Sequence, residues 1–86
     1  MRKDLEQFFI DNDINGIFVD GHDNAIMGIC RKFNSYSVLY DTIQIIENLK
    51  EDMTEEEAWD FYEFNIVGAW IGDNTPIFMV EYAKKD

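Results

Sequence analysis

The sequence predicts an α+β fold: a small single domain (1–86) in which an antiparallel sheet is packed by about three helices. Apolar residues recur at helical spacing near the N-terminus and in two segments after residue 41. Short apolar runs bounded by turn residues lie between these segments and near the C-terminus. At 86 residues, the chain is long enough for one hydrophobic core. The expected element order is α-β-β-β-α-α-β.

The first half of the chain is expected to form one helix and three strands. These elements are a helix at 2–10 and strands at 17–19, 25–33 and 36–40. Turn-forming residues at 11–16 end the helix, and those at 20–24 join the first two strands into a predicted β-hairpin. Asn34-Ser35 supplies the turn before the third strand.

The second half is expected to form two capped helices and a final strand. Asp41 followed by Gln44, and Thr54 followed by Glu57, have the spacing of a capping box. The expected elements are a helix over about 42–51, a helix that starts after Thr54 and ends at Gly68 or Gly72, and a strand at 77–82. The predicted core consists of Phe8, Phe9, Ile26, Ile46, Leu49, Phe61, Tyr62 and Phe78.

The net charge of the chain limits the classes of molecule that it is expected to bind. The chain has 18 acidic and 7 basic residues, for a net charge of −11. Binding to nucleic-acid phosphates or to an anionic membrane needs a basic surface, so neither is expected as a direct partner. The expected partner is a protein with a basic surface, and the oligomeric state is left open.

Cysteine content and the N-terminus point to a reducing compartment. The single cysteine, Cys30, has no partner for an intramolecular disulfide. The first residues lack the apolar run of a signal peptide, and no apolar stretch approaches the ~20 residues of a membrane span. A cytoplasmic location is therefore expected.

One motif resembles the start of an EF-hand calcium loop. Asp11-x-Asp13-x-Asn15-Gly16 places oxygen ligands at alternate positions before a glycine. The twelfth position, normally a bidentate Glu, is His22, and a predicted strand follows where the motif requires a helix. A helix end leading into Asx turns is the favoured interpretation, and a calcium site is the alternative.

The sequence gives weak support to a zinc site or a catalytic site. His22 and Cys30 are the only good soft metal ligands, and a zinc site normally needs four ligands, or three and a water. Cys30 is interpreted as a buried apolar residue and His22 as an ordinary turn residue, although a dyad between them across the hairpin is conceivable. The sequence has no nucleophile elbow and no phosphate-binding glycine loop. No enzymatic activity, metal or cofactor is therefore expected.

The most informative feature is a run of acidic residues over 47–63, in which Lys50 is the only basic residue. At helical spacing, Glu56, Asp60 and Glu63 share one face, and Glu47 and Glu51 share another. One interpretation is a solvated face with acids that favour helix N-termini. The other is a docking surface for a basic groove, formed by Glu47, Glu51, Glu56, Asp60 and Glu63.

One part of the sequence resembles the closing part of a family of small phage- and prophage-encoded proteins. It consists of Glu57-Ala58, then Phe64-Asn65-Ile66-Val67-Gly68-Ala69-Trp70-Ile71-Gly72, then Thr75-Pro76-Ile77-Phe78. The turn at 20–23 and the residues 25–28 are similar to the middle section of that family. The resemblance implies a mobile-element origin and a bacterial cytoplasm, and it carries over no catalytic residues.

Small acidic phage proteins often occupy a nucleic-acid site or a protein interface of the host. The leading hypothesis is therefore a protein that inhibits or modulates a basic host target, such as a nucleic-acid-binding or defence protein. The alternative is an accessory or structural phage protein that binds another phage protein or self-associates through exposed aromatics such as Trp59 or Trp70.

Overall fold

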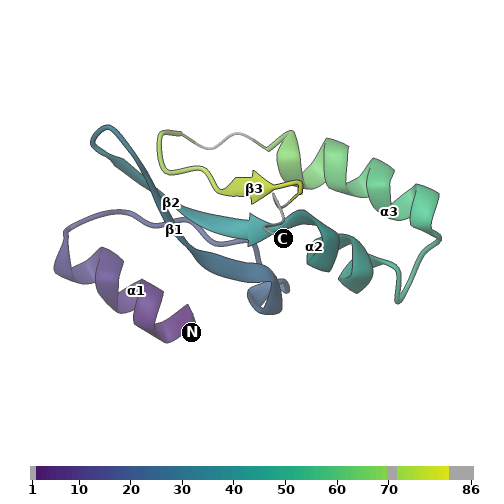
Figure 1. Cartoon of the computed structure of the whole chain (residues 1–86), viewed down its shortest axis with the longest axis horizontal. Helices are drawn as coiled ribbons and strands as arrows, with labels where there is room; N and C mark the ends of the chain where they lie inside the picture. Colours follow the sequence, from purple (N-terminus) through teal and green to yellow (C-terminus); the bar gives the residue numbers. More distant parts are fainter. Residues whose placement is uncertain (1, 70–71, 82–86) are drawn as a thin grey trace, which may run out of the picture.

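The computed structural model describes residues 2–69 and 72–81 of the chain. Within them the elements are α1 (Arg2–Asp11), the short 3₁₀ helix η1 (Asp23–Ala25), β1 (Ile26–Lys32), β2 (Ser35–Asp41), α2 (Thr42–Leu49), α3 (Glu55–Phe61), the π-helical segment η2 (Tyr62–Val67) and β3 (Ile77–Met79). The α+β class is confirmed. In Figure 1, α1 lies beside the hairpin toward one end of the molecule, and α2 and α3 lie toward the other.

The sheet of the described chain is mixed, with the order β1-β2-β3. β1 and β2 form an antiparallel hairpin around the turn at Phe33-Asn34, with Lys32 opposite Ser35. β2 and β3 are parallel, with Leu39 opposite Ile77. The prediction of an antiparallel sheet is therefore wrong for this second pair. The connection through α2 and α3 is a crossover, which brings β3 back in the direction of β2.

The predicted strand at 17–19 is not a strand, and the hairpin predicted between it and 25–33 does not form. The backbone N–H of Val19 donates instead to the hydroxyl of Tyr40, with 2.7 Å between the atoms. Ile14, Phe18 and Val19 pack against the core as half-buried side chains of an irregular segment. Their apolar character therefore reflects packing and not strand pairing, and the observed main-element order is α-β-β-α-α-β.

Both predicted N-caps form at the starts of α2 and α3, but only one of the two predicted capping boxes does. The carboxylate of Asp41 accepts the N–H of Ile43 at 3.1 Å, but Gln44 bonds to Asn48 and forms no capping box. In contrast, Thr54 and Glu57 form the predicted box. The Thr54 N–H donates to Glu57 Oε1 at 2.9 Å, and the Glu57 N–H donates to Thr54 Oγ1 at 3.2 Å.

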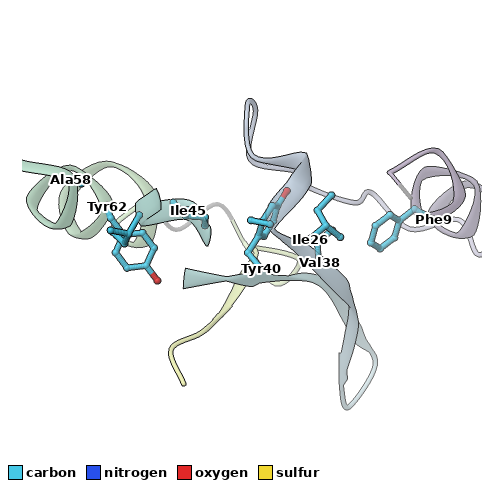
Figure 2. Close-up of a cluster of buried hydrophobic side chains, with 9 residues drawn as sticks. Phe9, Ile26, Val38, Tyr40, Ile45, Ala58 and Tyr62 are labelled. Atoms are coloured by element: carbon cyan, nitrogen blue, oxygen red, sulfur yellow. The ribbon is translucent and has the colours of Figure 1, made fainter. Parts of the chain in front are cut away.

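A single cluster of buried side chains joins the helices to the sheet (Figure 2). Phe9, Ile26, Ile46 and Tyr62 are buried as predicted, and Phe8, Leu49 and Phe78 are half-buried against the cluster. Phe61 is wrongly predicted as core, because 41% of it is exposed. Ala58 of α3 and Tyr62, the first residue of η2, are four residues apart and share the inner face of the continuous helix, so the neighbouring Phe61 points away from the core.

The C-terminal part matches the prediction in outline. η2 ends with Gly68 as its C-cap, one of the two predicted glycines. The final strand covers Ile77–Met79. Trp70, Tyr82 and the tail lie outside the described residues. No helix of the described part is long and apolar enough to cross a bilayer.

Candidate functional site

All five predicted partner-binding residues are exposed, but they do not form one surface. Glu47 lies on α2, Glu56 and Asp60 lie on α3, and Glu63 lies on η2. Glu51 lies in the turn after α2, because this helix ends at Leu49 and not at 51 as predicted. The predicted helical face shared by Glu47 and Glu51 therefore does not exist.

Part of the acidic charge is neutralised locally. The ammonium of Lys50 lies 3.6 Å from a carboxylate oxygen of Glu47 and 3.6 Å from one of Glu55. These are exposed pairs, which contribute little to stability. Of the four predicted acids outside these pairs, Glu56, Asp60 and Glu63 lie together on α3 and η2, whereas Glu51 lies in the turn after α2.

Next to these acids lies a surface hollow of about 390 Å³, here called the apolar-acidic groove. It is lined by Met53, Glu57, Asp60, Phe61, Phe64 and Asn65. Phe64 is 80% exposed and Phe61 is 41% exposed. The Glu57 carboxylate accepts hydrogen bonds from the Thr54 N–H and hydroxyl, and these lower its pKa, so the group is ionised at neutral pH. The groove thus combines aromatic rings with negative charge.

The π-helical turn shapes this surface. The N–H of Gly68 donates to the carbonyl of Glu63, five positions earlier, at 3.1 Å. The wider turn keeps Ile66 half-buried against the core while Phe64 and Val67 are exposed. Single-turn π segments of this kind are often found at functional sites.

Sequence reasoning missed the groove because it assigned Phe61 to the core and did not assign Phe64. A signal was present in the aromatic residues Trp59, Phe61, Tyr62 and Phe64. At about 100° per residue they cover more of the helix circumference than one buried face can hold. At least one of these rings had to be exposed.

A second hollow, of about 610 Å³, lies between the turn before β1 and the end of α2, and Glu51 is in its lining. His22 is buried there and is not an ordinary turn residue. Its Nδ1 lies 3.1 Å from the side-chain nitrogen of Asn48, which also pairs with Asn24 through two amide hydrogen bonds. Burial lowers the pKa of His22, so the ring is neutral at pH 7. These contacts hold the turn before β1 against the end of α2.

The calcium-like motif has other roles in the structure. The Asp11 carboxylate accepts a hydrogen bond from Gln7 at 2.8 Å, and the Asn12 amide donates to the Phe8 carbonyl at 2.8 Å. A Cβ at Gly16 would overlap the ring of Phe9, so packing explains this glycine. Among the described residues, no group of three or more His, Cys, Asp or Glu is placed to hold a metal ion.

The predicted burial of the cysteine thiol is only partly correct. Cys30 lies in β1 opposite Ser37 and is half-buried, not fully buried. In the described part of the chain, the side-chain contact of the His22 ring, its conceivable dyad partner, is between Nδ1 and the Asn48 amide and not with Cys30.

Exposed aromatic rings beside carboxylates can hold an apolar side chain next to an ammonium or guanidinium group. This is the chemistry that the apolar-acidic groove offers. Comparisons with protein-family models, with curated proteins and with solved structures found no match.

Proposed function

We propose that this protein is a binding domain that docks a protein with a basic surface onto its apolar-acidic groove. The observation that carries the proposal is the exposure of Phe61 and Phe64 beside the carboxylates of Glu57 and Asp60. Interfaces are commonly built from aromatic anchors surrounded by a polar rim. Exposed aromatic side chains that the fold does not bury are better explained by binding than by stability.

Charge selects a basic partner. The chain carries a net charge of −11, which attracts positive surfaces over long range and repels nucleic acid and anionic lipid. Glu56, Asp60 and Glu63 extend the negative field along α3 and η2. The carboxylates would raise the association rate and select the partner, while the rings would supply the buried contact.

The resemblance to small phage- and prophage-encoded proteins suggests what the partner does. A basic host protein that binds nucleic acid, or a defence protein, would be inhibited or modulated when its positive surface is covered. The same groove would also suit a basic phage protein, as an accessory or structural role requires. Both versions assign binding and no catalysis, and both place the protein in a bacterial cytoplasm.

The test begins with affinity capture from host lysate and identification of the bound protein by mass spectrometry. The purified partner is then titrated against the wild type and a variant with Glu56, Asp60 and Glu63 all replaced by lysine. We expect binding to weaken by at least about tenfold in the variant, and wild-type binding to weaken as salt rises, because exposed charges are screened beyond ~8 Å at physiological ionic strength.

A matched control separates the groove from net charge. Replacing Asp4, Glu6 and Asp20 with lysine makes the same change in charge at exposed positions outside the groove and outside the tip of the β1–β2 hairpin. This control should bind almost as well as the wild type. Phe64→Ser should weaken binding without changing its salt dependence, because it removes an apolar contact only. Equal affinity for wild type and the Glu56-Asp60-Glu63 variant, with circular dichroism showing both folded, would contradict the proposal.

A further inference from the structure

The tip of the β1–β2 hairpin, here Arg31, Lys32 and Phe33, carries an unexplained aromatic side chain. Phe33 is 84% exposed, more than the other large hydrophobic side chains that the structure describes. Its φ is +53°, a conformation that bulky residues rarely adopt and that glycine or asparagine usually supplies in two-residue hairpin turns. Neither core packing nor local conformation accounts for a phenylalanine at this position.

The same tip is positively charged in an otherwise acidic molecule. Arg2 and Lys50 are each paired with carboxylates of their own chain. At the tip, Arg31 donates from Nε to the carbonyl of Phe33 at 3.0 Å, and its guanidinium lies 6.0 Å from the centre of the Tyr36 ring. Lys32 is exposed beside it. The hairpin thus presents an apolar ring flanked by two cationic side chains.

The hairpin tip and the apolar-acidic groove are complementary. The tip offers one aromatic ring with positive charge, and the groove offers a hollow of about 390 Å³ lined by two aromatic rings with negative charge. In Figure 1 the hairpin turn lies at one end of the molecule and α3 toward the other, so the two cannot meet within one copy. We infer that the hairpin tip of one copy docks into the apolar-acidic groove of a second copy.

Phe33 would enter among the groove's rings, with Arg31 and Lys32 beside Glu57 and Asp60. Reciprocal docking, with each tip in the groove of the other copy, would give a two-fold dimer, whereas one-way docking from copy to copy would give rings or open chains. A hairpin tip buries little area, so the association should be weak and transient.

The inference rests on the groove of the proposed function, and also on the hairpin tip, which that function does not use. A basic partner and a second copy would compete for the same groove. Self-association would then lower the amount of groove available to the partner.

The experiment is sedimentation velocity over a range of protein concentrations at low and high salt. Wild type should gain mass with concentration. Each variant is compared with wild type at the same salt, because salt screens both the attraction between tip and groove and the repulsion between two copies of net charge −11. Phe33→Asn should weaken association by at least about tenfold. Asparagine suits a positive φ, so this variant should melt at or above the wild-type temperature.

A charge swap identifies the two patches. Lys32→Glu and Asp60→Lys should each weaken self-association, whereas Lys3→Glu, a matched change on α1, should not. Mixing the Lys32→Glu and Asp60→Lys proteins should restore association, because the unchanged tip of the second protein fits the unchanged groove of the first, and the carboxylate introduced at position 32 can meet the ammonium introduced at position 60. Restoration would not occur if the copies met through other surfaces.

The outcomes separate this inference from the proposed function. A wild type that stays monomeric up to its solubility limit, or a Phe33→Asn protein that associates like wild type, would overturn the inference. Capture of a basic partner would still stand in either case, since Phe33→Asn keeps the groove. The opposite outcome is also possible. If Asp60→Lys loses self-association, the inference is supported. If the Glu56-Asp60-Glu63 variant still binds the partner like wild type, the proposed function is rejected.

Discussion

One buried hydrogen bond should make a measurable contribution to stability. The hydroxyls of Tyr62 and Thr42 lie 2.6 Å apart, and the two residues are 3% and 0% exposed. Tyr62→Phe keeps the edge-on ring contacts with Trp59 and Phe78 but leaves the Thr42 hydroxyl without this partner in the interior. A buried polar group left unpaired costs about 1–3 kcal/mol, so we expect the free energy of unfolding to fall by that amount.

Thr42→Val removes the other hydroxyl with little change in shape and should cost a similar amount. The double variant should lose less than the sum, because no polar group is then left unpaired, and the coupling energy should be about 1 kcal/mol. Urea unfolding followed by circular dichroism and by tryptophan fluorescence measures all four proteins. In thermal melts, each kcal/mol should lower Tm by about 4–8 °C in a domain of this size. Additive effects would refute the view that the two hydroxyls act as a pair.

Two other predictions follow from buried groups. Gly16→Ala should lower the free energy of unfolding by about 1–3 kcal/mol, because the new methyl group overlaps the Phe9 ring, and an unchanged Tm would contradict this packing. Burial lowers the pKa of His22 from 6.5, so the unfolded chain takes up the proton first, and stability should fall as pH drops below about 6.5. Urea titrations at about pH 7.5 and 5.5 should show a smaller loss for His22→Gln than for wild type, and equal losses would exclude this role.

Features that depend on nearby residues were predictable. The capping box at Thr54 and Glu57 and the N-cap at Asp41 form because their hydrogen bonds join residues within one turn. The acidic residues of the candidate surface were also correctly expected to be exposed, since ionised groups are seldom buried without a partner. The charged part of the candidate surface was therefore visible in the sequence.

Features that depend on distant residues were not predictable. The 17–19 segment has the composition of a strand, but its Val19 N–H bonds to Tyr40 from another element. The assignment of Phe61 to the core failed because the choice between Phe61 and Tyr62 depends on how α3 is rotated. That rotation is set partly by Thr42 and Phe78, which contact the side chain of Tyr62.

By itself the sequence determined the α+β class, the helix starts, the negative charge and the position of the acidic run. These properties follow from composition and from spacings of a few residues. The tertiary structure alone decided the parallel pairing of β2 and β3, the exposure of Phe61 and Phe64, and their position beside carboxylates. The physical reason is that strand partners and the outward face of a helix are selected by packing between distant segments, which local patterns do not encode.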